Sequence, residues 1–343
     1  MDQFYQQLIN GIVLGGIYAL IAVGYTMVYG IIQLINFAHG EIFMLGAYFA
    51  FTLVNFTPIP FWVAIFVSML FCAGVGMLMD YVAYRPLRNA PRLSALITAI
   101  GVSIGLQNLA RILWGAKPQT FTDDTLPTIF QQISPMKEPK VFFSIFGVTF
   151  TDAAIQFSEN VSLAYLDLTI IVLAIILMVS LNRLVSLTKI GKAMRACAQN
   201  RIAANLMGVR TNQVIAITFA IGSALGAVAG VMVGVRDNIG PTMGLHKGVA
   251  AFAAAVLGGI GNITGAMVGG LLMGLAEVFG AGYIDPMIAT ICHTIGLGEF
   301  YDSEKISHSY GSGYRIAISY IVMIIVILIR PTGLFGKASA HRA

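Results

Sequence analysis

Residues 183–212 read RLVSLTKIGKAMRACAQNRIAANLMGVRTN and carry six basic residues and no acidic one. Apolar runs long enough to cross a bilayer as helices lie on both sides of this segment. A segment with so many charges is too costly to place in lipid. The chain therefore spans a membrane several times, and this segment lies on one side of it. Its basic residues are Arg183, Lys189, Lys192, Arg195, Arg201 and Arg210.

The composition of the 343-residue chain is that of an integral membrane protein. Hydrophobic residues make up 57% of it, charged residues only 10%, and the mean hydropathy is +0.83. Soluble proteins carry about 25% charged residues. The 37 glycines suit helices that pack closely in lipid, because small residues let two backbones approach. We expect an all-α fold, a single polytopic bundle of transmembrane helices over residues 1–343.

The apolar runs predict eight or nine membrane segments. Seven runs approach the roughly 20 residues that a span requires. Two more, 42–57 and 249–261, would reach only about 20 to 24 Å as helices, against a hydrocarbon core of about 30 Å. Each short run needs its polar, glycine-containing neighbour to complete a crossing, or it re-enters the membrane without crossing. The seven longer runs are 7–30, 61–83, 93–113, 163–182, 213–235, 264–281 and 314–330.

The charges between the runs predict the orientation. Nine crossings that begin outside leave a net charge of +10 on the side of residues 183–212 and −5 on the other, in total the +5 of the chain. Because basic loops stay in the cytoplasm, we expect a cytoplasmic segment 183–212, a periplasmic N-terminus and a cytoplasmic C-terminus. In the periplasmic loop 114–162, apolar and polar residues alternate from Val141 to Thr151, which predicts a β-hairpin. This loop is either a platform for an external partner or a passive lid.

The chain lacks the motifs of an energy-converting enzyme. It has no GxxxxGK[ST] phosphate loop, no HExxH and no catalytic triad pattern. The cysteines, Cys72, Cys197 and Cys292, lack a metal-binding spacing. We expect no catalytic residue, no metal and no cofactor in this chain, and no nucleic-acid partner. Energy for transport must then come from another protein.

Residues 183–212 also have an ordered face. Small or short side chains recur there at helical spacing and end at Gly208. Such a face suits a helix that enters a narrow groove of a partner; the alternative is a basic loop that only orients the chain. The residues of this small-residue face are Ala193, Ala196, Cys197, Asn200, Ala204 and Met207.

Two polar interruptions precede the short runs. Polar groups at this depth are costly unless they face protein or water, so they are candidates for a translocation pathway; a tie between helices is the alternative. When the sequence is aligned with itself at an offset of 207 positions, His39 pairs with His246, which suggests an internal repeat. Among carboxylates we expect only Glu41 to be buried in a span, and we assign Gln107, Asn108 and Arg111 to the membrane interface. The pathway candidates are Gln33, Asn36, His39, Glu41 and His246.

Three stretches resemble a known family. They are Gly15–Leu20 (GGIYAL), Asn36–Glu41 (NFAHGE) with Met44–Tyr48 (MLGAY), and Arg195–Val209. The chain is similar, nearly end to end, to the permease subunit of bacterial branched-chain amino-acid ABC importers, the LivH type. In that family a cytoplasmic helix docks in a cleft of the ATPase subunit. The resemblance implies this role for Gly191, Arg195, Ala203, Ala204 and Gly208.

The resemblance implies partners and a cargo as well. It predicts two cytoplasmic ATPase subunits that bind ATP and Mg²⁺, a second related permease subunit and a periplasmic amino-acid-binding protein, all at the inner membrane of a bacterium. The cargo would be leucine, isoleucine and valine; related permeases carry urea or short amides, and an ion-coupled carrier is the alternative from another class. Ile202 stands where the general permease signature has a Glu before the Ala pair. The salt bridge of that Glu is not expected here.

Overall fold

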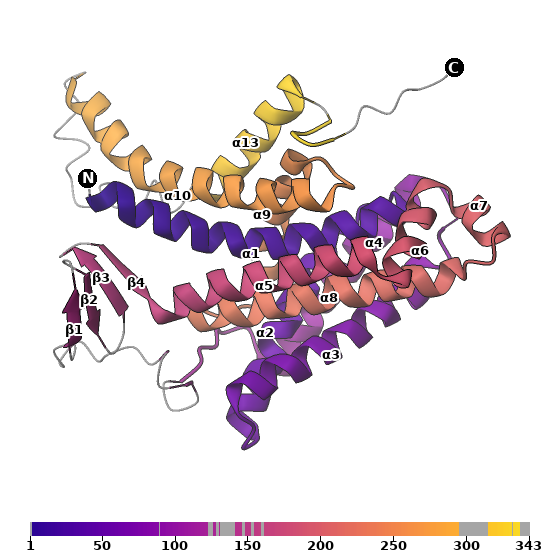
Figure 1. Ribbon diagram of the computed structural model, residues 1–343, viewed down its shortest axis with the longest axis horizontal. Coiled ribbons are helices and arrows are strands. Elements are labelled where there is room, and N and C mark those ends of the chain that lie inside the picture. Colours follow the sequence, from indigo (N-terminus) through magenta and orange to yellow (C-terminus); the bar gives the residue numbers. More distant parts are fainter. Residues whose placement is uncertain are drawn as a thin grey trace.

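A computed structural model describes residues 2–88, 90–122, 126–127, 130, 141–145, 148–151, 154–158, 161–294, 315–330 and 332–336. Long helices dominate it and lie roughly side by side, with a small β-sheet at one end and two short helices, α6 and α7, at the other (Figure 1). We call these the sheet end and the α6–α7 end. The described helices confirm the expected all-α bundle. They are α1 (Asp2–Ile32), α2 (His39–Phe56), α3 (Phe61–Met79) with the π-helical turn η1 (Asp80–Tyr84), α4 (Arg92–Trp114), α5 (Tyr165–Leu187), α6 (Lys189–Gln199), α7 (Arg201–Leu206), α8 (Thr211–Arg236), α9 (Met243–Gly258), α10 (Ile263–Thr294) and α13 (Arg315–Ile329).

Each predicted apolar run coincides with a helix, but some bounds differ. Among the described residues, six helices are long and apolar enough to cross a membrane, while α9 and α13 are shorter. Within the described residues α13 has 15 residues, or about 22 Å, and the expected full span over 314–330 stays a prediction. The expected run 249–261 is also displaced. Helix α9 starts six residues earlier, at Met243, and ends before the turn at Gly259–Gly261.

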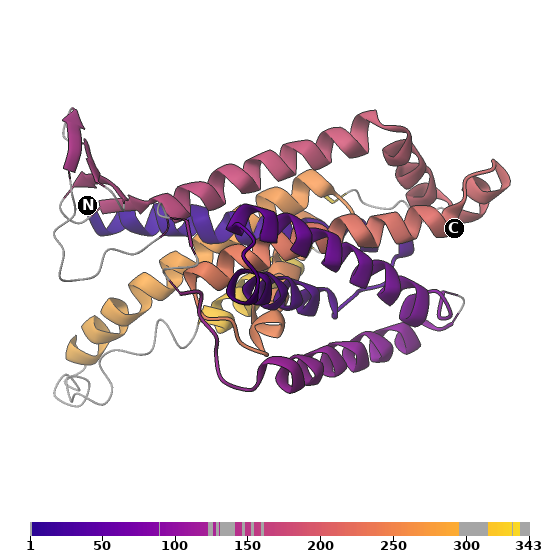
Figure 2. The same ribbon diagram turned by 90° about the horizontal axis from the view of Figure 1, so that it is seen from below.

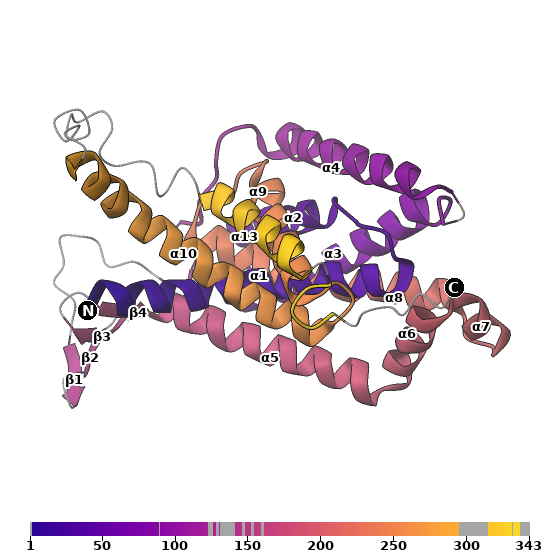
Figure 3. The same ribbon diagram turned by 90° about the horizontal axis from the view of Figure 1, so that it is seen from above.

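The halves of the chain run in opposite directions. Helices α1 and α3 run toward the α6–α7 end, whereas α8 and α10 run toward the sheet end (Figures 1 and 3). Helix α1 of the first half packs along α10 of the second half, and α3 of the first half packs along α8 of the second. The two halves therefore interlock. The backbones approach closely: a Cβ on Gly15 would lie 2.8 Å from the Cα of Leu271. This arrangement is that of an inverted repeat, with α5–α7 as the link.

Helix α2 occupies the centre of the bundle. Helices α3, α8 and α9 pack against it, and its side chains Phe43 and Tyr48 are fully buried. By contrast α3, α4 and α5 expose most of their apolar side chains. Exposed apolar helix surface is expected where lipid or another membrane subunit replaces water.

The small sheet lies beside the N-terminus of α1 (Figure 2). Strands β1 (Val141–Ile145) and β2 (Val148–Thr151) pair antiparallel and confirm the predicted hairpin; residues 146 and 147 between them lie outside the described residues. Strands β3 (Ala154–Ser158) and β4 (Val161–Ala164) extend it to a four-stranded antiparallel sheet in chain order. The Ser162 amide donates to Gln6 Oε1 over 2.9 Å, which fixes the sheet to α1.

Candidate functional site

Helices α2 and α9 both begin inside the bundle, and their N-terminal turns meet. A Cβ on Gly244 would lie 2.6 Å from the carbonyl oxygen of Gly40, and a Cβ on Gly248 would lie 3.0 Å from the Cα of Gly40. Only glycine permits backbones this close. From the junction α2 runs to the sheet end, where its Thr52 accepts a hydrogen bond from Trp114 of α4 over 2.7 Å. Helix α9 runs to the α6–α7 end.

The side chain of Glu41 lies at this junction. It is fully buried, and its Oε1 accepts hydrogen bonds from Ser103 Oγ at 2.9 Å and Gln107 Nε2 at 2.8 Å, both on α4. Its Oε2 has no hydrogen-bond partner among the described residues and faces the first turn of α9, 2.5 Å from where a Cβ on Gly244 would stand. The N-termini of α2 and α9 both carry partial positive charge near this carboxyl group. Glu41 thereby links α2, α4 and α9.

The neighbouring pathway candidates His39 and Asn36 are also buried. The imidazole of His39 lies against the glycine surfaces of α1 and α8, and its ring contacts that of Tyr25 at 4.8 Å between centroids. Asn36 Oδ1 accepts a hydrogen bond from the Tyr84 hydroxyl over 2.7 Å. His39 Nε2 and Asn36 Nδ2 have no partner among the described residues. Buried polar atoms without partners are costly, so these two atoms mark the 36–41 segment as unusual among the described residues.

The other two candidates do not join this cluster. Gln33 is exposed at the end of α1, where its φ of 55° is left-handed and ends the helix. His246 is exposed on α9, so the suggested equivalence of His39 and His246 does not extend to their burial. A pathway role for these five residues stays a prediction.

The basic segment forms two helices instead of one, because Asn200 breaks the expected helix and caps α7. Most of the small-residue face turns toward the chain's own spans: Cys197 is 2% exposed and Ala204 5%. The expectation that this face is free to enter a partner's groove is therefore wrong at α6. A helix face of small residues predicts close packing, but the spacing of these residues does not say whether the face packs on the chain's own helices or on a partner protein.

Gly191 and Arg195 hold α6 against the end of α5. Arg195 Nη1 donates to the carbonyl of Val185, and a Cβ on Gly191 would lie 2.5 Å from the carbonyl oxygen of Leu184. Gly191 is buried and offers no docking surface here, whereas Arg195 is exposed. Their predicted coupling role stays a prediction.

Helix α7 points away from the bundle (Figures 1 and 3). Ile202 is 76% exposed, Leu206 82% and Met207 84%. Ala203 is exposed beside them, and the segment ends at Gly208 with a φ of 85°. We call Ile202, Leu206 and Met207 the α7 patch. Exposed apolar clusters of this kind mark interaction surfaces.

A polar link joins the start of α8 to α3. Arg88 donates to both carboxylate oxygens of Asp80, at 2.6 and 2.9 Å, and to Asn212 Oδ1 at 2.5 Å. Burial, and next the nearby positive Arg88, lower the pKa of Arg201. The α6–α7 segment is thus connected to α1, α3, α5 and α8, and a displacement of α7 has several routes into the bundle.

Comparison with known proteins identifies the family. The family described as "Branched-chain amino acid transport system / permease component" matches residues 7–329. The chain belongs to this family. BraD of Pseudomonas aeruginosa, named a high-affinity branched-chain amino acid transport system permease protein, is 37% identical, with 99% of this chain and 98% of BraD covered.

Other relatives cover nearly the whole permease as well. LivH of Escherichia coli K12 is also named a high-affinity branched-chain amino acid transport system permease protein. It is 36% identical, with 99% of this chain and 97% of LivH covered. A probable branched-chain amino acid transport permease protein LivH of Methanocaldococcus jannaschii is 25% identical over 95% of this chain and 91% of its own. No solved structure matches the permease. The family resemblance seen in the sequence is confirmed.

The sequence did not reveal the partners of Glu41 or the burial of a further carboxylate, Glu277. Gln107 does not belong to an interface cluster, since it bonds Glu41 inside the bundle together with Ser103. The sequence spacing could have predicted this site, because Ser103 and Gln107 lie four residues apart and so share one face of an apolar helix. Glu277 is a second buried carboxylate, 3% exposed, and accepts hydrogen bonds from Tyr18 at 2.7 Å and Ser319 at 3.1 Å. It ties α10 to α1 and α13.

Proposed function

We propose that the chain is the membrane-spanning permease subunit of an ATP-binding-cassette importer that brings leucine, isoleucine and valine into the cytoplasm. The end-to-end match to the branched-chain amino acid permease family carries this proposal. The names of the relatives favour this cargo over urea or short amides. The proposal excludes an ion-coupled carrier, because the driving energy enters through a partner.

The proposed orientation places the α6–α7 end in the cytoplasm and the sheet end in the periplasm of a bacterial inner membrane. The structure groups Arg88, Arg195 and Arg201 at the α6–α7 end, which agrees with the cytoplasmic preference of basic loops. The described N-terminus of α1 lies at the sheet end. The last residues, 337–343, lie outside the described part of the chain, so the cytoplasmic C-terminus stays a prediction from charge.

The proposed partners follow from the family and from the α7 patch. Two ATPase subunits would bind ATP and Mg²⁺, and one of them would receive Ile202, Leu206 and Met207 in an apolar cleft. A second related permease would complete the membrane domain, and a periplasmic binding protein would deliver the cargo at the sheet end. ATP supplies the energy in those subunits. The residues of this chain contribute docking, transmission and the path.

Transmission in this proposal runs from α7 to the α2–α9 junction. A moving cleft shifts α7, and Arg195 and the Asp80–Arg88–Asn212 link pass the shift to α5, α3 and α8. Helix α8 packs on α2 and lies beside His39. Helices that start inside the bundle with unpartnered polar atoms at their first turn tilt at low cost, because few hydrogen bonds must break. Opening this junction would admit the cargo.

Reconstitution tests the proposal. The chain is assembled with the partner permease and the ATPases of its own genome in vesicles, and the periplasmic binding protein is added with labelled leucine. ATP-dependent uptake that unlabelled isoleucine and valine compete, and urea does not, is the expected result. Uptake by this chain alone, driven by a proton or sodium gradient, would contradict it.

A further inference from the structure

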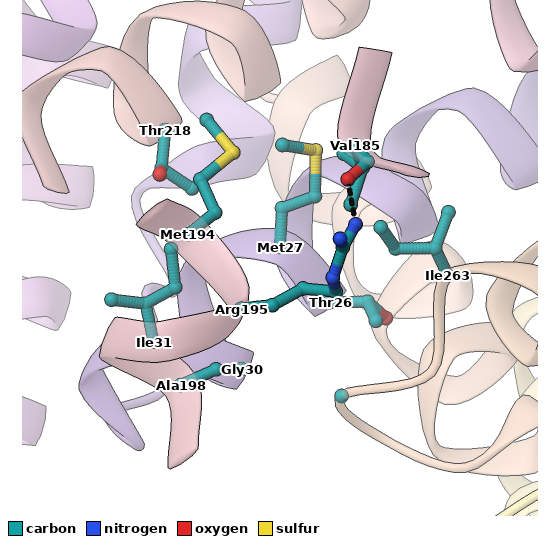
Figure 4. A pocket seen from close by; sticks show the side chains of 11 residues that line it. Thr26, Met27, Gly30, Ile31, Val185, Met194, Arg195, Ala198, Thr218 and Ile263 are labelled. Carbon is teal, nitrogen blue, oxygen red and sulfur yellow. Dashed lines mark hydrogen bonds between the residues drawn. The ribbon is translucent and has the colours of Figure 1, made fainter. Parts of the chain in front are cut away.

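A cavity lies beneath α6 at the α6–α7 end, between the ends of α1 and α5, the middle of α8 and the turn that starts α10. Its volume is about 80 Å³. Apolar side chains dominate its wall, with one guanidinium and two hydroxyls among them, and none of its described lining residues is acidic. Figure 4 shows Thr26 next to the Arg195 side chain, with Met27, Ile31, Met194 and Ile263 around them.

The hydroxyl of Thr26 is the unusual feature of this wall. Threonine hydroxyls in helices commonly bond the carbonyl four residues back, and Thr52, Thr169 and Thr218 each do so at 2.8 Å. Thr26 is 1% exposed and its Oγ1 has no hydrogen-bond partner among the described residues. A buried hydroxyl without a partner costs free energy unless a ligand or water completes it.

Arg195 supplies the charge at the same wall. A guanidinium carries five N–H donors, and the structure uses one nitrogen, Nη1, to hold the Val185 carbonyl. Further donors are left for an anion, and a guanidinium prefers the two oxygens of a carboxylate. The whole basic segment contains no acidic residue that would compete for it. The charged group that fits this wall is therefore a carboxylate.

The apolar part of the cavity limits the ligand's size. A cavity of about 150 Å³ holds a benzene molecule, so 80 Å³ suits a chain of three or four carbon atoms. Met27, Ile31, Met194 and Ile263 would surround such a chain, and methionine adapts to different branching.

We propose that this cavity binds a small carboxylate with a short aliphatic chain, held by Arg195 and Thr26, and that the ligand slows import. In the orientation given above the cavity opens to the cytoplasm, so the imported amino acid or its keto acid would reach it from inside. Because the ligand would join α6 to α1 and α8, it would oppose the motion of the coupling segment. This inference rests on the proposed function for the identity of the amino acid.

The experiment uses the assembled importer in lipid nanodiscs without the periplasmic binding protein. Calorimetric titration with L-leucine, 4-methyl-2-oxopentanoate and leucinamide separates the possible sources. Leucine binding with no binding of the other two assigns an amino-acid site, and binding of both acids but not the amide assigns a general carboxylate site. Binding of leucinamide equal to that of leucine, or no binding of either acid, would overturn the inference.

Two threonine variants in the same wall make a matched pair. Thr26→Val is expected to weaken leucine binding about fivefold, the effect of one lost hydrogen bond. Thr218→Val removes a hydroxyl already bonded to its own helix and is expected to leave the affinity unchanged. Equal affinities for Thr26→Val and the parent protein would refute the site. Arg195→Gln, measured by binding alone, is expected to weaken it more than tenfold.

Transport supplies the functional readout. Initial uptake into vesicles preloaded with leucine is compared with uptake into empty vesicles. Slower uptake after preloading, relieved by Thr26→Val and not by Thr218→Val, supports the proposal; equal uptake contradicts the regulatory part of it. Absence of uptake into empty vesicles would instead count against the proposed function, and the titration would still decide whether the site binds its ligand.

Discussion

Helices α6 and α7 belong to one basic segment, yet α6 packs against the membrane-spanning helices and α7 is exposed. In α6 the small residues at helical spacing pack against α1, α5 and α8, and Cys197 is 2% exposed. In α7 the apolar residues Ile202, Leu206 and Met207 are exposed. The break at Asn200 allows this difference, because its cap starts a new helix with a new direction. One helix holds the segment to the spans and the other is left for a partner.

The largest effect that would sharpen this comparison is expected in the α7 patch. Leu206→Glu places a charge in the proposed apolar contact and should weaken ATPase binding about thirtyfold, as loss of a central interface residue does. Uptake should fall accordingly, while the amount of permease in the membrane stays normal. Co-purification of the ATPase and leucine uptake measure the two. Leu206→Met is the control, and normal uptake by Leu206→Glu would argue against docking through α7.

A substitution in α6 should act on folding instead. A Cβ on Gly191 meets the carbonyl oxygens at the end of α5, so Gly191→Ala should lower the free energy of unfolding by about 1 to 3 kcal/mol. Gly101→Ala on the exposed face of α4 is the control, because nothing lies within 4 Å of its Cβ. Thermal unfolding in detergent measures both. Equal stability of the two variants would contradict the close packing of α6 on α5.

Glu41 and Glu277, both buried, allow a finer test of the path beyond α6. Glu41→Gln keeps an acceptor for Ser103 and Gln107 but replaces the Oε2 that faces the first turn of α9 with an amide nitrogen, which interacts less favourably with a helix N-terminus, so we expect transport rates to change about two- to fivefold. Glu277→Gln keeps the acceptor for Tyr18 and Ser319 and should leave the rates unchanged. The turnover and half-saturation concentration of uptake are measured in both. If the two variants behave alike, Glu41 is a helix tie like Glu277.

The smallest effect concerns thiol labelling. Burial raises the pKa of the Cys197 thiol, although the nearby Arg201 lowers it. A raised pKa means less thiolate at neutral pH, so Cys197 should react slowly with maleimide and faster as the pH rises. In a Cys292→Ser background, Met207→Cys should react quickly at pH 7 and be shielded when the ATPase is added. Rapid labelling of Cys197 at pH 7 would contradict the inward face of α6.

The sequence by itself determined the class of the protein and the positions of its helices. Apolar length indicates a span and charge asymmetry predicts the orientation of the chain in any fold, because both depend on the membrane and not on neighbouring helices. The polar segment Asn36–Glu41 was found for the same reason, since ionisable groups in an apolar run are costly wherever the run packs. The family motifs then named the permease.

Only the tertiary structure decided which groups meet. Glu41 bonds residues more than sixty positions away, and Glu277 bonds Tyr18 at the other end of the chain. The side-chain period of α6 defined a face of small residues, but a small face packs equally well on the chain's own helices or on a partner. That choice depends on where α1, α5 and α8 end in space. The local sequence does not determine these distances in space. The exposure of α7 and the cavity beneath α6 could therefore be seen only in the tertiary structure.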